Sequence, residues 1–331
     1  MAESDFDDVL LHIVTGKGGT GKTTVAASLA LALASRGKTV LLCEVEGRQG
    51  IAQLFDVAPL PYEERLIARA SQSGHGDVYA LAIDPESALM EYLAMYYRLG
   101  RAGKALDRFG VIEFATTIAP GVRDVLLTGK VYEAAHRNSR NKGARTYDAI
   151  VLDAPPTGRI AQFLNVNNEL AGLAKMGPIK SQADTVTTLL RSKRTAVHLV
   201  TVLEEMPVQE TIDGIAELRS GHLHVGGIIV NMVRPQDLDA ADRSALLNET
   251  VDTGALTSTL ETAGVEATPA LVGTLLAEGR DHAERRALED SQRSLLEGQD
   301  VPAYELPRLP EGADLSGLYD LAAVLREAGV A

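Results

Sequence analysis

The chain has 331 residues, 45% of them apolar, and a formal net charge of −13 from 45 acidic and 32 basic side chains. This length fits one large α/β domain or two smaller ones, with enough apolar residues for a sizeable core. The acidic balance argues against nonspecific binding to nucleic acid or to an anionic membrane. A single cysteine, Cys43, excludes an internal disulfide. The acidic N-terminus has no apolar signal segment, so we expect a cytoplasmic protein.

Strand and helix patterns alternate along the chain. Apolar, β-branched runs predict buried strands at 9–15, 39–45, 78–83, 149–153, 196–203 and 225–231. Helical patterns follow at 23–35, 209–219, 240–299 and 315–327. Strands that are apolar throughout are typical of a mostly parallel sheet with helices on both faces. The mixed charges of 280–289 predict a solvated helix face.

A glycine-rich loop lies between the first predicted strand and the helix that follows it. Residues 16–23 fit the phosphate-binding template G-x-x-x-x-G-K-[ST]. Lys22 is expected to reach the β- and γ-phosphates, and the Thr23 hydroxyl to bind Mg²⁺. Lys17 is an additional lysine that the template does not require. The cofactor-binding residues predicted in this loop are Gly16, Gly18, Gly19, Thr20, Gly21, Lys22, Thr23 and Thr24.

The same glycines also fit the dinucleotide fingerprint G-x-G-x-x-G, and Glu44 and Glu46 follow near the place of a ribose-binding carboxylate. Two features favour a nucleoside triphosphate over a dinucleotide. The pair Lys22-Thr23 supplies a charge and a metal ligand that a dinucleotide turn does not need. In addition, the strand 149–153 ends in Asp153, which can hold Mg²⁺ directly or through water.

The segment after Asp153 reads Ala154-Pro-Pro-Thr-Gly158, which prevents the strand from continuing. A shaped loop next to the phosphates is what a nucleotide switch requires. We therefore predict one P-loop nucleoside-triphosphate-binding domain over 1–331, with an α/β fold built on a mostly parallel sheet flanked by helices. The segments 85–146 and 165–194 are expected to be helical insertions that form a subdomain.

These motifs resemble a known family. Residues 16–24 are similar to the deviant Walker A loop shared by the arsenite-pump ATPase, the tail-anchored-protein targeting ATPase, and the Min and Par ATPases. Residues 153–158 resemble the switch II segment of the first two. The resemblance continues through 119–121, 207–210, 230–231 and 306–307, and so covers nearly the whole chain. It is strongest to actinobacterial anion-transporting-ATPase-like proteins, which occur with a paralogous partner.

The resemblance implies a dimeric ATPase that uses ATP and Mg²⁺. Lys17 would reach across the dimer to phosphates bound by the other subunit, Asn231 would contact adenine, and the backbone near Pro307 would close over the base. It implies a homodimer or a heterodimer with a paralogous ATPase, and the heterodimer is favoured. Hydrolysis would drive motion of the switches and the helical subdomain for a protein client or a membrane partner. The acidic net charge argues against a nucleic-acid partner.

One departure from the family concerns the first switch. The family has Asp-Pro-Ala where this chain has Glu46-Gly47-Arg48. Glu46 keeps a carboxylate, but it is one methylene longer and precedes a flexible glycine. This leaves open whether Glu46 is a working catalytic base, a poor one or a structural remnant. The alternative function is therefore an ATP-binding, weakly hydrolysing subunit that activates or scaffolds a paralogous ATPase.

Overall fold

The computed structural model describes residues 6, 8–45, 47–70, 74–97, 120–137, 144–165, 178–310 and 312–330. An eight-stranded sheet with the order β3-β4-β2-β5-β1-β6-β7-β8 forms its centre, and only β3 runs antiparallel to its neighbour. The strands are β1 (Leu11–Gly16), β2 (Val40–Glu44), β3 (Arg65–Ala68), β4 (Val78–Ala82), β5 (Ala149–Asp153), β6 (Thr195–Thr201), β7 (Val225–Val233) and β8 (Ala303–Pro307).

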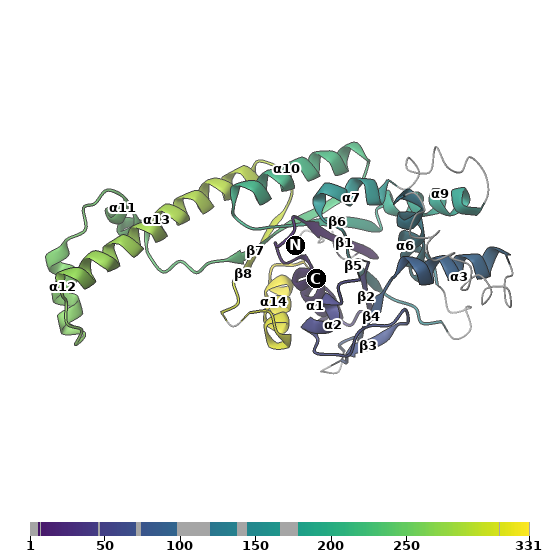
Figure 1. Cartoon of the computed structure of the whole chain (residues 1–331), viewed down its shortest axis with the longest axis horizontal. Coiled ribbons are helices and arrows are strands. Elements are labelled where there is room, and N and C mark those ends of the chain that lie inside the picture. The colour runs from purple at the N-terminus through teal and green to yellow at the C-terminus, as the bar shows by residue number, and fades with distance from the viewer. Residues whose placement is uncertain are drawn as a thin grey trace.

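Helices cover both faces of this sheet (Figure 1). They are α1 (Lys22–Ser35), α2 (Gly50–Leu54), α3 (Pro85–Tyr97), α6 (Pro120–Ala135), α7 (Thr157–Leu164), α9 (Pro178–Leu190), α10 (Glu205–Ser220), α11 (Ala240–Leu247), α12 (Thr253–Thr262), α13 (Pro269–Glu297) and α14 (Leu315–Glu327). Helices α1, α2 and α14 pack in the apolar cluster on one face, and α6, α7, α9 and α10 pack in the cluster on the other. The predicted mostly parallel α/β fold is therefore confirmed.

The two edge strands β3 and β8 were not predicted. Each is short and partly exposed, so neither has the continuous apolar run that marks the inner strands. The helices α3, α6 and α9 fall within the segments predicted as helical insertions. Residues 98–119, 138–143 and 166–177 of those segments lie outside the described residues. A separate helical subdomain stays a prediction.

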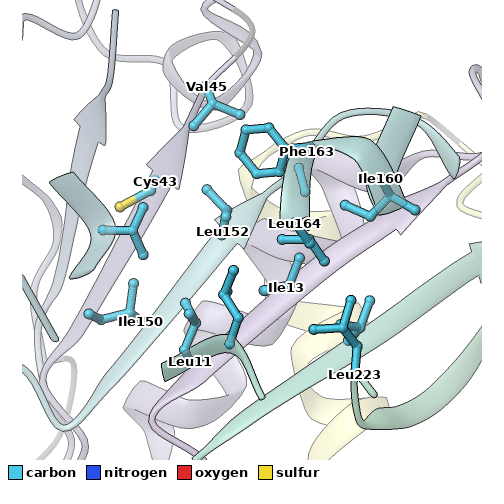
Figure 2. Close-up of a cluster of buried hydrophobic side chains, with 14 of the residues drawn as sticks. Leu11, Ile13, Cys43, Val45, Ile150, Leu152, Ile160, Phe163, Leu164 and Leu223 are labelled. Carbon is cyan, nitrogen blue, oxygen red and sulfur yellow. The ribbon is translucent and has the colours of Figure 1, made fainter. Parts of the chain in front are cut away.

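The sheet is held by side chains that alternate between its two faces. Figure 2 shows one of these clusters, in which apolar residues of β1, β2 and β5 pack against α7. Cys43 lies in this cluster and is fully buried, and burial raises the pKa of its thiol above the ordinary value. It is therefore a core residue and not a reactive thiol, as its place in an apolar strand predicts.

A long helical arm extends from the sheet on the side away from α3, α6 and α9 (Figure 1). Its axis is α13, which at 29 residues is about 43 Å long. The smaller helices α11 and α12 lie along its outer part and contribute no buried residue. Nearer the sheet, Arg286 and Glu289 are buried and form an ion pair at 2.7 Å. The prediction of a solvated face for 280–289 is wrong at these two positions. No helix among the described residues is both long and apolar enough to cross a membrane.

Two buried histidines lie beside each other on β1 and β6. His12 Nδ1 and His198 Nε2 are 3.1 Å apart, and the ring of Phe6 stacks on both imidazoles. Both histidines are fully buried. Burial lowers the pKa of His12 well below its usual value and lowers the pKa of His198 to about 3, with a smaller contribution from repulsion by a neighbouring imidazole in each case. Both rings are therefore neutral in the folded protein at neutral pH.

We expect the free energy of unfolding to fall as the pH is lowered below about 6.5. The unfolded chain takes up protons at the ordinary histidine pKa, whereas the folded protein takes them up only at lower pH, so folding stability is lost in this window. The loss approaches roughly 1.4 kcal/mol per pH unit for each histidine. Urea unfolding at pH 7.5 and 5.5 measures this loss of folding stability. Replacing His12 and His198 together by leucine should flatten this pH dependence, and the exposed control His222→Gln should preserve it. An unchanged slope in the double variant would contradict the assignment.

Candidate nucleotide-binding site

The predicted phosphate-binding loop connects the end of β1 to the start of α1. Gly19 and Gly21 have φ angles of +90° and +86°, a region that favours glycine. A Cβ atom at Gly21 would lie only 2.4 Å from Asn231 Nδ2. At Gly18 and Gly19, by contrast, no heavy atom of the described residues beyond the chain neighbours lies within 4 Å of the Cβ position. The loop is thus packed tightly against β7 at Gly21 and open at Gly18 and Gly19, which leaves its backbone accessible to a ligand.

Hydrogen bonds from within and outside the loop fix its shape. The Thr20 hydroxyl donates to the carbonyl oxygen of Lys17 at 2.9 Å, and Asn231 Nδ2 donates to the carbonyl of Thr20 at 2.9 Å. The side chain of Lys22 is largely buried, and its Nζ lies 3.5 Å from the same Lys17 carbonyl. Thr24 follows in the first turn of α1 and is half-buried. The start of α1 therefore presents its backbone N–H groups and a lysine to one point, which is an arrangement suited to phosphate.

Asp153 lies beside this loop because β5 is the parallel neighbour of β1. Val14 and Asp153 are register partners, and the Thr23 hydroxyl donates to Asp153 Oδ2 at 2.6 Å. The Thr15 hydroxyl donates to the carbonyl of Pro155 at 2.7 Å and so holds the segment after Asp153. A hydroxyl and a carboxylate are oxygen ligands that Mg²⁺ prefers, so the donor set fits the expected metal. Thr23 and Asp153 are the residues that would hold Mg²⁺ together with nucleotide phosphates.

Glu44 is a further acidic residue at this edge that was not among the predicted P-loop site residues. It ends β2 and is the register partner of Asp153 on β5. Its side chain is buried; Oε2 accepts from the Ile51 amide at 3.3 Å, and Oε1 has no hydrogen-bond partner among the described residues. The signal in the sequence is an acid at the end of the strand that neighbours β5. A buried carboxylate beside Asp153 makes this edge more favourable for a cation.

Lys17, the lysine beyond the template, forms an ion pair within its own chain. Its Nζ lies 2.8 Å from Glu210 Oε1 on α10, and Glu210 Oε2 accepts from the hydroxyl of Thr157 at 3.2 Å. One carboxylate thus joins the phosphate-binding loop to the first residue of α7. Both charged side chains are about one-third exposed, and ion pairs of this kind stabilise a fold by at most about 1 kcal/mol. Lys17 can therefore exchange this partner for another at small cost.

Three further residues were predicted to belong to the site: Glu46, Asn231 and Pro307. Glu46 lies outside the described residues. Asn231 is buried in β7 and holds the loop through Thr20, as described above. Pro307 ends β8 and is the register partner of Val233 on β7, so the two predicted base contacts belong to adjacent strands. Their contacts with adenine stay predictions.

The fold and this loop define the class of protein: a P-loop nucleotide-binding α/β domain. Residues 10–191 match the family model described as anion-transporting ATPase. The chain is 52% identical to the ATPase BagA of Mycobacterium tuberculosis over 327 residues, which cover 99% of this chain and 95% of that protein. It is also 31% identical over 173 residues to the ATPase get3 of Aspergillus niger, covering 51% of this chain and 46% of the relative. The chain belongs to the anion-transporting ATPase family and is an ATPase.

Gly21, which is tightly packed, and Gly18, which is open, allow a matched test of the packing of the loop. We expect Gly21→Ala to destabilise the nucleotide-free protein by roughly 1–3 kcal/mol, because alanine would be strained at this φ and would collide with Asn231. Gly18→Ala adds the same methyl group where no atom of the described part of the chain opposes it, and should change the free energy of unfolding by less than about 1 kcal/mol. Chemical unfolding without nucleotide measures both. Equal destabilisation by the two variants would contradict the described packing of the loop.

Proposed function

We propose that this chain works as a Mg²⁺- and ATP-dependent dimeric ATPase that couples ATP binding and hydrolysis to motion of its switch and helical segments. The purpose of that motion would be to act on a protein client or a membrane partner. The observation that carries the proposal is the hydrogen bond between Thr23 and Asp153 beside a largely buried Lys22. Lys22 and the loop backbone would hold the phosphates, and Thr23 and Asp153 would hold Mg²⁺, which supplies charge neutralisation at the phosphates.

The role proposed for Lys17 is charge stabilisation at the phosphates of a second subunit. Such a charge, supplied from outside the site, acts like an arginine finger. The weak ion pair with Glu210 supports this role, because it holds the Lys17 side chain at α10 and yet lets it move to another partner. The resemblance to proteins that occur with a paralogous partner favours a heterodimer over a homodimer. Asn231 and the backbone near Pro307 would contact the adenine base.

A path from the phosphates to the helices can be followed through α7. Thr157 begins this helix and bonds to Glu210, and Arg159 lies 4.0 Å from Asp124 on α6. Loss of the γ-phosphate would alter the segment between Asp153 and α7 first. A shift of α7 would then change its contact with α6, which belongs to the predicted helical insertion. This route gives the proposed coupling a physical basis.

The alternative function, a weakly hydrolysing subunit that activates a paralogue, is favoured by one observation. Gly47 has a φ angle of +67°, which proline cannot adopt. The loop after β2 therefore has a backbone that the family sequence Asp-Pro-Ala could not share. A misplacement of about 1 Å at a catalytic group can reduce a rate by roughly 10²-fold. Binding of ATP would survive such a change, while turnover would depend on Glu46.

The two functions can be distinguished by measuring the rate of phosphate release from ATP. The rate is measured for the isolated chain and for the chain mixed with its paralogue. If the isolated chain hydrolyses ATP and Glu46→Gln abolishes hydrolysis, the principal proposal holds and the alternative fails. We expect Lys22→Ala to lose ATP binding, and Lys17→Ala to keep binding but lose roughly 10³-fold or more in turnover within the active dimer. Full activity of Lys17→Ala in every dimer would remove the role across subunits. No hydrolysis by the isolated chain, with stimulation of the paralogue, would favour the alternative.

A further inference from the structure

A small cavity lies next to the nucleotide site but is lined by different residues. Its volume is about 90 Å³, and its wall includes Arg48, Arg123, Arg159 and Asp124. Val45 and Phe163, which lie next to each other in Figure 2, form part of its apolar side. Pro155 also lines the cavity, and none of the phosphate-binding loop residues does. The cavity is thus a separate feature at the carboxyl edge of the sheet.

The three arginines come from three different parts of the fold. Arg48 follows β2, Arg123 belongs to the first turns of α6, and Arg159 belongs to the first turn of α7. Among the described residues of the lining there is one carboxylate, that of Asp124, which is almost fully buried and lies 4.0 Å from Arg159. These described residues together have a formal charge of +2. The N-terminal ends of α6 and α7, which carry partial positive charge, add to this field.

Guanidinium groups recognise oxyanions through paired N–H donors, and three of them line this one cavity. The cavity is small, at about 90 Å³, and so suits a compact tetrahedral oxyanion better than a large anion. We propose that the cavity is a binding site for a tetrahedral oxyanion, with inorganic phosphate as its ligand.

A phosphate in this cavity would bridge the loop after β2, the start of α6 and the start of α7. It would hold together the elements that the proposed switch motion must separate. Binding is expected to stabilise one arrangement of the three elements and so to make the ATPase sensitive to phosphate in a way that competition at the nucleotide site does not explain. The binding site itself does not depend on dimer formation or on hydrolysis by this chain.

The test is calorimetric titration of inorganic phosphate into the full chain saturated with ADP and Mg²⁺, so that the phosphate-binding loop is already occupied. We expect one site, and a loss of affinity of about tenfold or more in Arg123→Gln, because a charge-assisted hydrogen bond is removed. Arg123→Lys, which keeps the charge but not the planar donor pair, should bind with intermediate affinity. The control Arg285→Gln removes one exposed arginine from α13 and should bind as the wild type does.

Arg48→Gln, on a different element, should also weaken phosphate binding, and it replaces Arg123→Gln as the test variant if that protein proves unstable. Lys22→Ala should retain the site even if it no longer binds ADP, which separates failure here from failure of the nucleotide assignment. Sulfate should compete with phosphate, and phosphoserine should bind more weakly. Absence of binding in the ADP complex, equal affinity in wild type and Arg123→Gln, or tighter binding of phosphoserine would overturn the proposal.

Discussion

The parallel register of β2, β5 and β1 is the constraint on which the rest of the site depends. The carboxyl ends of parallel neighbours meet at one edge, so Glu44, Asp153 and the loop after β1 are brought together although more than 100 residues separate the first two from each other. The 2.6 Å hydrogen bond from Thr23 to Asp153 follows from this register. A shift of one residue in β5 would turn Asp153 to the other face of the sheet and remove the metal ligand.

Charged contacts join this edge to the helices on one face of the sheet. Glu210 contacts both Lys17 and Thr157, and Arg159 approaches Asp124. A second set of contacts surrounds α6. Lys130 pairs with Glu91 on α3 and with Glu133 on α6 itself. Arg137, just after α6, pairs with Glu133 and with Glu64 before β3, and Glu64 accepts from Tyr147 at 2.6 Å. These contacts are the route by which the proposed displacement of α7 would reach α6 and then the segment before β3.

The fold and the place of the glycine-rich loop between β1 and α1 could largely be predicted, because both depend on local patterns. The inner strands are continuous apolar runs, and the spacing from Gly16 to Thr23 is sufficient to identify the loop. The edge strands β3 and β8 lack such runs. The arm built on α13 depends on how its helices pack against each other, and the spacing of residues in the sequence does not predict that packing. The contacts of Lys17 with Glu210 and of Arg159 with Asp124 join residues far apart in sequence. They become visible only when the sheet has placed their helices.

In the proposed ATP site, Asp153 and Thr23 together form the side that binds the metal. The most direct test of this metal site is the ratio of the ATP affinities with and without Mg²⁺. It is measured in the wild type, in Asp153→Asn and in Asp148→Asn. Asp148 precedes the opposite end of β5 and bonds to the Thr39 amide, so its replacement changes the same charge away from the site. We expect Asp153→Asn to lose about tenfold or more of the Mg²⁺-dependent gain in affinity while binding metal-free ATP at least as well, and Asp148→Asn to behave as the wild type. A full Mg²⁺-dependent gain in Asp153→Asn would contradict the claim.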